Sequence, residues 1–215
     1  MCGLFGFVAK NDDSQLNLRI LGMIAKNTQS RGRHAWGMAW VDRAGELHCF
    51  KQTGPVGDAL PLLGMAADAT MLIGHCRYAT HGSPSENSNN HPHVMKDGFV
   101  VHNGMIHNYQ DLILEFGLRT HTECDSEVLG LLIDKLRGKS LLSRVAKTAE
   151  LARSKSPFAM LTLTKTSLCA VRSNDQPLHW GETPRGYYLA SLPDALPGEP
   201  RTIPQNEVLL YGSAA

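Results

Sequence analysis

The second residue of the chain is a cysteine, Cys2, followed by Gly3 and an apolar run. A cysteine thiolate is a strong nucleophile, but a thiol of ordinary pKa needs a base to accept its proton. Removal of Met1 gives Cys2 a free α-amine, whose usual pKa is close to that of a thiol. The other interpretation makes Cys2 a small buried hydrophobic residue at the start of a strand. The opening stretch alone favours this second interpretation.

Five later segments are rich in polar, turn-forming and catalytic residue types. They read SRGRHAWG (30–37), GHCRYATHG (74–82), NNHPH (89–93), HNGMIHNY (102–109) and TECDSEV (122–128). Each residue in them, taken singly, has an ordinary structural explanation that we prefer. Their joint occurrence in this order favours a site that does chemistry.

The alternatives differ from residue to residue. Arg77, at the end of an apolar run, is either a surface arginine or a fork that holds a carboxylate through two hydrogen bonds. Asn103 and Gly104 form either a hairpin turn or an oxyanion hole made of an amide and a backbone N–H. Asp125 either caps the helix that follows it or faces a substrate ammonium. The sequence leaves these alternatives open.

Histidines and cysteines give no metal-site pattern. His91 and His93 resemble a pair of metal ligands, but no further ligand has useful spacing, so no metal is predicted. The five cysteines are odd in number and widely spread, without a Cys-x-x-Cys pair. Reduced thiols are therefore expected, and neither a disulfide framework nor a cofactor is predicted.

Together with Cys2, these segments resemble the class II glutamine amidotransferases, which use an N-terminal nucleophile. The match is greatest to the glutaminase half of glucosamine-6-phosphate synthase. The comparable stretches there read approximately CGIVG, RGYDSAG, HTRWATHG, NAHPH, HNGIIENY and SETDTEV. The segments 172–181 and 187–191 resemble two further stretches, so the likeness covers nearly the whole chain.

The resemblance implies hydrolysis of the glutamine side-chain amide to glutamate and ammonia. It implies that Cys2 is the nucleophile after Met1 removal, with the α-amine as base, and that Gly3 leaves room for the substrate. It also implies that Asn103 and Gly104 form the oxyanion hole.

The resemblance assigns substrate-binding roles as well. Arg77 is expected to pair with the α-carboxylate of glutamine and Asp125 to hold its α-ammonium. Thr80, His81 and His91 match positions that line or support the pocket.

The chain departs from the family pattern at a few positions. His34 replaces an aspartate, and Trp36 replaces a small residue. Cys76 and Tyr78 flank Arg77 in place of a threonine and a tryptophan, and one extra residue lies before His91. These departures bear on loop geometry and on kinship within the family, and Cys76 is expected to be a buried structural thiol.

Hydrophobic periodicity predicts the elements that position these residues. Expected strands are 4–9, 35–41, 47–52, 71–78, 99–102, 158–164, 167–172, 187–190 and 207–211, and expected helices are 16–27, 59–67, 109–116, 126–136 and 141–152. The segment 82–93 is expected to be a long, functional loop. Strands and helices in runs favour an α+β fold with antiparallel sheets. The resemblance specifies a four-layer αββα sandwich of the N-terminal-nucleophile hydrolase type.

Bulk properties describe an ordinary globular protein. The 215 residues are 42% hydrophobic and 19% charged, with a formal net charge of +1, which argues against a nucleic-acid or membrane-surface binder. The absence of a long apolar run or a basic leader predicts a cytosolic protein. We expect one glutaminase domain over residues 1–215, without a synthetase domain.

Three hypotheses follow. The leading one is a free-standing glutaminase that binds L-glutamine and supplies ammonia to a separate synthetase. The second is a hydrolase of another amide, such as a γ-glutamyl compound. The third is a catalytically silent relative with a regulatory role, which the complete set of expected catalytic residues disfavours.

Overall fold

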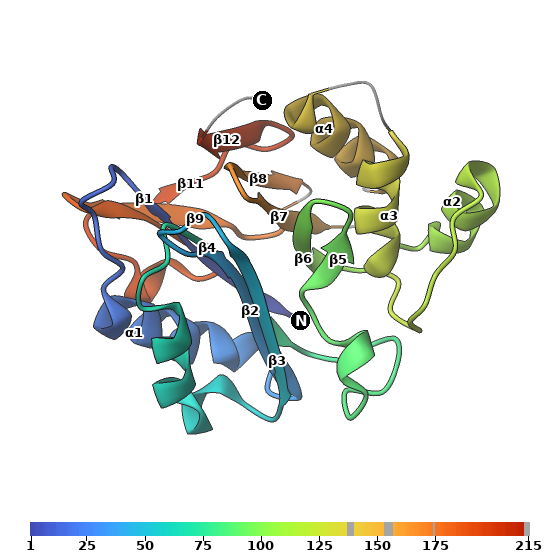
Figure 1. Ribbon diagram of the computed structural model, residues 1–215. Helices are drawn as coiled ribbons and strands as arrows, with labels where there is room; N and C mark the ends of the chain where they lie inside the picture. Colours follow the sequence, from blue (N-terminus) through green and yellow to red (C-terminus); the bar gives the residue numbers. More distant parts are fainter. Residues whose placement is uncertain (137–139, 153–156, 174, 213–215) are drawn as a thin grey trace.

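A computed structural model describes residues 1–136, 140–152, 157–173 and 175–212, in which two antiparallel sheets are packed between helices (Figure 1). The larger sheet has the strand order β11-β9-β10-β1-β4-β2-β3. Its strands are β1 (Gly3–Ala9), β2 (Ala35–Val41), β3 (Leu47–Thr53), β4 (Met71–Arg77), β9 (His179–Thr183), β10 (Gly186–Ala190) and β11 (Arg201–Thr202). The smaller sheet has the order β12-β8-β7-β6-β5. Its strands are β5 (His93–Met95), β6 (Gly98–Gly104), β7 (Phe158–Thr164), β8 (Ser167–Ser173) and β12 (Val208–Gly212).

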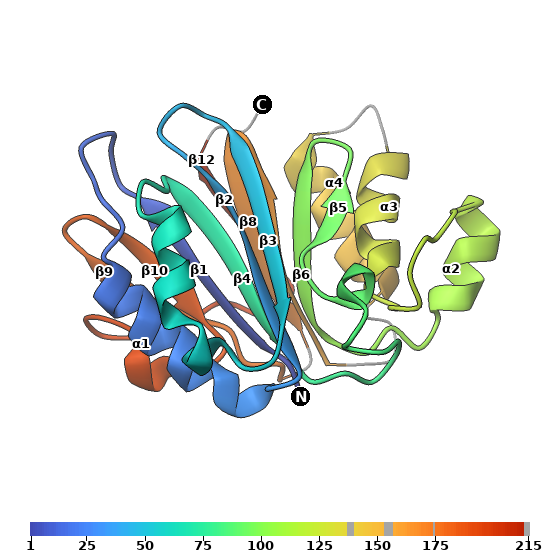
Figure 2. The ribbon, with the colours of Figure 1, turned by 60° about the horizontal axis from the view of Figure 1, so that its bottom comes forward.

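The layers follow one another in the order helix, sheet, sheet, helix (Figure 2). Helix α1 (Leu18–Thr28) and the 3₁₀ segment η3 (Leu60–Ala66) cover the outer face of the larger sheet. Helices α3 (Glu127–Lys135) and α4 (Leu141–Ala152) cover the smaller sheet, with α2 (Tyr109–Phe116) beside α3. The predicted αββα arrangement is confirmed.

Period-two alternation explains the three cores between these layers. In β1, Leu4 and Val8 face the smaller sheet, whereas Phe5 and Phe7 pack under α1. A third core lies between the smaller sheet and the helices, with Val100 of β6 among its members. Because successive side chains of a strand point to opposite faces, a strand buried on both faces is apolar throughout.

Strand pairing brings the ends of several strands to one edge of the sandwich. The start of β1 pairs with the end of β4, with Gly3 opposite Cys76. The start of β2 meets the same end, with Ala35 opposite Arg77. Strand β6, which ends at Gly104, packs across both β1 and β4. Residues that lie far apart in the sequence therefore meet at this edge.

Most predicted elements are confirmed, some with shifted ends. The segment expected as a helix over 59–67 is instead the 3₁₀ helix η3, in which Pro61 stands near the start. The loop over 82–93 contains a 3₁₀ turn, Asn87–Asn89, and ends in the short strand β5. Strands β5, β9 and β11 were not predicted. No helix in the described ranges is long and apolar enough to cross a membrane.

Candidate active site

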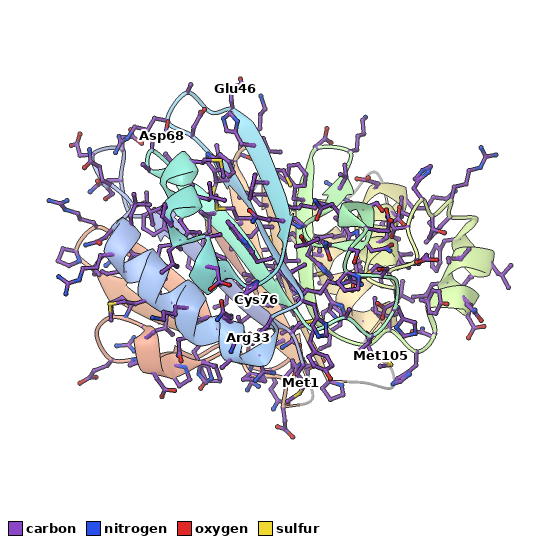
Figure 3. The ribbon with its side chains drawn as sticks, turned by 90° about the horizontal axis from the view of Figure 1, so that it is seen from below. Met1, Arg33, Glu46, Asp68, Cys76 and Met105 are labelled. Atoms are coloured by element: carbon purple, nitrogen blue, oxygen red, sulfur yellow. The ribbon has the colours of Figure 1, made fainter. Side chains whose placement is uncertain are left out.

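A pocket of about 410 Å³ lies at the edge where β1 starts and β6 ends. Its lining includes four predicted site or processing residues, Cys2, Thr80, Asn103 and Gly104, and also Met1. Figure 3 shows Met1 and Met105, both of which line this pocket, at the same edge of the molecule. Tertiary folding thus joins the first residues of the chain to the end of β6.

Cys2 is half-buried, and its thiol is held by one residue of the neighbouring strand. The Tyr78 N–H donates to Cys2 Sγ at 3.3 Å, and the thiol donates to the Tyr78 carbonyl at 3.4 Å. Arg31 Nε fixes the Cys2 carbonyl at 2.7 Å. Burial raises the pKa of the Cys2 thiol, more than the Tyr78 backbone and nearby positive charges lower it. The thiol therefore needs a base to become a nucleophile near neutral pH.

The end of β6 supplies two groups suited to stabilise an oxyanion. Asn103 is buried, and its Nδ2 amide has no hydrogen-bond partner in the described part of the chain. Gly104 has φ of +148°, and a Cβ there would lie 2.4 Å from the Pro157 carbonyl. An unpaired amide donor that lines the same pocket as a thiol is the kind of group that an oxyanion hole uses.

Arg77 is buried, and the N–H groups of its guanidinium donate hydrogen bonds to neutral acceptors. It donates to Asn90 Oδ1 at 2.7 Å, to the Gly82 carbonyl at 3.0 Å and to the His81 carbonyl. No carboxylate among the described residues forms an ion pair with it. Arg77 does not line the pocket, although its charge lowers the pKa of Cys2.

Asp125 is the opposite buried charge. Its Oδ2 accepts a hydrogen bond from the Ile106 N–H at 2.7 Å, and the Ser126 hydroxyl approaches Oδ1 at 3.4 Å. No cation within the described ranges pairs with it. Its negative charge reaches Cys2 and raises the pKa of the thiol, yet the side chain does not line the pocket.

The two histidines predicted to line or support the pocket, His81 and His91, are not among its lining residues. His81 contacts the ring of Tyr109, with ring centroids 6.0 Å apart, and its carbonyl accepts from Arg77. His91 is buried and stacks on His75 with centroids 3.9 Å apart.

His91 belongs to a layer of four buried histidines, the others being His75, His93 and His102. His75 contacts the His102 carbonyl at 3.0 Å, and His102 Nδ1 contacts the Ser126 hydroxyl at 2.9 Å. Burial lowers the pKa of His75 to about 3 and that of His102 to about 4, and it lowers the pKa values of His91 and His93 as well. All four imidazoles are therefore neutral at physiological pH.

The structure adds groups that the sequence reasoning did not assign. His107 and Gln176 line the pocket, as do Met105 and Pro157. His107 and Gln176 fall in segments that resemble the family, so their position in the sequence was the available signal. Residue 174, in the same segment as Gln176, lies outside the described residues. The structure also brings Cys124 beside His91 and His93, which supplies a third candidate metal ligand.

The structure also shows what the departures from the family pattern do. His34 Nδ1 accepts from the Ala79 N–H at 3.0 Å, and its ring stacks on Tyr78 with centroids 4.9 Å apart. Trp36 is a core residue. Cys76 is fully buried, and burial raises its pKa, as expected for a structural thiol.

Gly3 has a different role from the one expected. A Cβ there would lie 2.4 Å from Thr28 Cγ2, at the end of α1. The space beside Gly3 is therefore filled by the helix, and the glycine allows close packing of β1 on α1.

No protein-family model matches the chain. Curated relatives include glutamine–fructose-6-phosphate aminotransferases [isomerizing]. The one from Aquifex aeolicus is 33% identical over 204 residues, which are 92% of this chain and 33% of the relative. The one from Geobacillus kaustophilus is 32% identical over 186 residues, which are 83% of this chain and 30% of the relative. The chain belongs to the class II glutamine amidotransferases.

This amidotransferase chain spans about a third of the length of these curated relatives. Among solved structures, a glutamine phosphoribosylpyrophosphate amidotransferase from Bacillus subtilis superposes with a TM-score of 0.75 at 23% identity, covering 98% of this chain and 49% of the other. A glutamine aminotransferase class-II domain protein from Silicibacter pomeroyi superposes with a TM-score of 0.65 at 14% identity, covering 99% and 95%. These likenesses establish a shared fold.

Proposed function

We propose that this chain hydrolyses the side-chain amide of L-glutamine to glutamate and ammonia, with Cys2 as nucleophile once Met1 is removed. The observation that carries the proposal is the common pocket of the Cys2 thiol and the unpartnered Asn103 amide beside Gly104. A thiol and an unpaired amide donor facing one space are the minimum for acyl transfer.

In the proposed reaction, the Cys2 sulfur attacks the amide carbon and its proton moves to the freed α-amine. The developing oxyanion accepts hydrogen bonds from Asn103 Nδ2 and the Gly104 N–H. The C–N bond then breaks as the amine returns a proton and ammonia leaves. Water hydrolyses the thioester, which releases glutamate and restores the thiol.

Met1 removal has two consequences in this proposal. It exposes the α-amine, since an amide nitrogen cannot act as a base near neutral pH. It also clears the pocket, because Met1 lines the cavity that the substrate has to enter. No histidine is hydrogen-bonded to the Cys2 thiol among the described residues, which favours the terminal amine as the base.

We further propose that Arg77 and Asp125 bind the two charged ends of glutamine. Each is a buried charge without an oppositely charged partner in the described ranges, and an unpaired buried charge is costly. An amino acid supplies one carboxylate and one ammonium, and so compensates both. Substrate binding then requires the Arg77 guanidinium to give up its hydrogen bonds to the carbonyls of residues 81–83. In this proposal Thr80 lines the pocket, and His81 and His91 support it.

The fate of the ammonia belongs to the same proposal. Ammonia in bulk water is protonated and loses its nucleophilicity, so a useful amidotransferase delivers it directly to an acceptor site. We propose that this site lies in a separate synthetase. The chain matches about a third of the length of its curated relatives, which fits an acceptor site outside the matched part.

The proposal is tested by measuring ammonia release from each amide with protein whose mass shows that Met1 is absent. Glutamine is compared with glutarate monoamide, which lacks the ammonium, and with 4-aminobutanamide, which lacks the carboxylate. We expect hydrolysis of glutamine and strongly reduced kcat/KM for both analogues. Equal turnover of all three would contradict the roles of Arg77 and Asp125, and no turnover of any would contradict the hydrolase assignment.

A further inference from the structure

Three buried side chains outside the Cys2 pocket form a cluster. The proposed amide hydrolysis gives none of them a chemical step. His91, His93 and Cys124 each offer one ligand atom, and these atoms lie within 4.8 Å of one another. The three residues are exposed by only 3%, 2% and 6%. His91 lies in the segment that leads into β5, His93 is the first residue of β5, and Cys124 lies just before α3.

Three of the four imidazole nitrogens in this cluster have no hydrogen-bond partner among the described residues. In the described part of the chain, neither ring nitrogen of His91 is paired, and Nε2 of His93 is unpaired as well. Buried polar atoms are nearly always satisfied, and each one left unpaired costs stability. A bound metal ion would supply the missing partner for two imidazoles at once.

The donor set selects the metal. Imidazole nitrogen and thiolate sulfur are the ligands that zinc prefers, whereas Mg²⁺ and Ca²⁺ require oxygen. With Zn–S near 2.3 Å and Zn–N near 2.0–2.1 Å, tetrahedral donors lie about 3.3–3.6 Å apart. The cluster has to contract by roughly 1 Å to reach this geometry.

We propose that His91, His93 and Cys124 bind one Zn²⁺ ion, with the fourth position open to water. On binding, the Cys124 thiol loses its proton to solvent and forms the Zn–S bond. The thiolate and the neighbouring Asp125 carboxylate, whose Oδ1 lies 3.8 Å from Cys124 Sγ, together offset the charge of the ion.

A neighbouring pocket is the candidate entry path for the ion. His93 also lines a pocket of about 520 Å³, whose rim includes Lys51, His121 and Glu127. Lys51 is a cation that opposes the approach of a metal, and Glu127 is a carboxylate that favours it. The rim is therefore close to neutral overall.

The ion would fasten two segments that position the proposed substrate charges. His91 directly follows Asn90, whose side-chain oxygen accepts from Arg77 at 2.7 Å. Cys124 directly precedes Asp125. An ion bound to both segments would hold Asn90, the partner of Arg77, at a fixed position relative to Asp125.

The test uses the full chain with Cys2→Ala, so that a terminal amine and thiol cannot chelate metal and hydrolysis cannot contribute. Metal-free protein is titrated with Co²⁺ and then with Zn²⁺. We expect one Co²⁺ per chain, a thiolate-to-cobalt charge-transfer band with tetrahedral d–d absorption, and displacement by one equivalent of Zn²⁺. Zn²⁺ should also raise the Tm.

Matched variants locate the ligands. Cys124→Ser should abolish the charge-transfer band and lower Zn²⁺ affinity by more than the 10–100-fold typical of outer-shell changes. Cys169→Ser, at another buried thiol, and Cys49→Ser, at an exposed one, should retain the band. Far-ultraviolet circular dichroism checks that each variant folds. Absence of the band in the parent protein, or a band that survives Cys124→Ser and disappears in Cys49→Ser, would overturn the proposal.

Discussion

The Cys2 pocket and the His91–His93–Cys124 cluster place the same functional group in opposite surroundings. Cys2 is half-buried at the wall of an open pocket, and in the described ranges its thiol contacts only the backbone of Tyr78. Cys124 is buried beside two imidazoles. A substrate can reach the first thiol, whereas an ion fits the second.

The difference shows that access and available partners, rather than residue type, assign chemistry to a thiol. A nucleophile needs a route for the substrate, a base and an oxyanion hole. A metal ligand needs other donors that are close by and otherwise unpaired. Burial raises the pKa of Cys124 to about 11, so this thiol is inert as a nucleophile without a metal.

The largest expected effect on the rate of hydrolysis comes from replacing Cys2. Cys2→Ala should lower kcat for glutamine hydrolysis by on the order of 10⁶, because no second thiol lines the pocket within the described ranges. Cys49→Ala is the matched control and should retain full activity. A glutamine-like electrophile should label Cys2 alone, as read by peptide mass spectrometry. Label on Cys124 with Cys2 free would reverse the comparison between the two thiols.

Blocking the α-amine should have the next largest effect. An N-terminal extension that leaves Cys2 in place should lower kcat by about 10²–10⁴, the usual contribution of a general base. Protease cleavage that leaves Cys2 as the first residue should restore activity, and both forms are compared by glutamate release. Full activity with the extension attached would assign the base to a histidine, of which His107 lines the pocket.

The third prediction concerns Asn103, the proposed oxyanion-hole donor in the Cys2 pocket. Asn103→Ala should lower kcat by about 10²–10³ with a smaller change in KM, because it removes a donor to the developing oxyanion. Asp125→Asn keeps an acceptor for the Ile106 N–H but loses the charge, so it should act mainly through KM. Steady-state kinetics separate the two patterns. A kinetically neutral Asn103→Ala would return the Asn103-Gly104 pair to a purely structural role.

The smallest effect concerns the stability of the histidine layer. The folded protein holds His75 and His102 neutral, with pKa values of about 3 and about 4, whereas unfolded histidines titrate near 6.5. Below about pH 6.5 the unfolded state binds more protons than the folded state. The free energy of unfolding therefore decreases as the pH is lowered. His91 and His93 are held neutral in the same way, so the four histidines together give a slope of up to about 5.4 kcal/mol per pH unit.

This slope is measured by urea unfolding of metal-free protein between about pH 7 and about pH 5. His75→Asn should reduce it by about a quarter, because one of the four neutral histidines no longer has to be charged on unfolding. His48→Asn, at a half-exposed histidine paired with Asp42, is the matched control. An unchanged slope in His75→Asn would show that its ring is already protonated in the folded state.

Local patterns predicted most of the elements. The helices Tyr109–Phe116 and Leu141–Ala152 match their predicted ends, because their apolar residues recur at helical spacing. Strands β5, β9 and β11 were missed. Strand β5 has only three residues and β11 only two, and β9 carries polar residues and a glycine. These strands exist through their pairing in the sheet.

The sequence by itself determined the motif set, and with it the family, the candidate nucleophile Cys2 and the candidate oxyanion hole at Asn103 and Gly104. Only the tertiary structure decided that Thr28 fills the space beside Gly3 and that Cys124 meets His91 and His93. The physical reason is that a sequence pattern reports neighbours along one strand or helix. Strand register and helix packing determine which distant side chains share a pocket or a metal site.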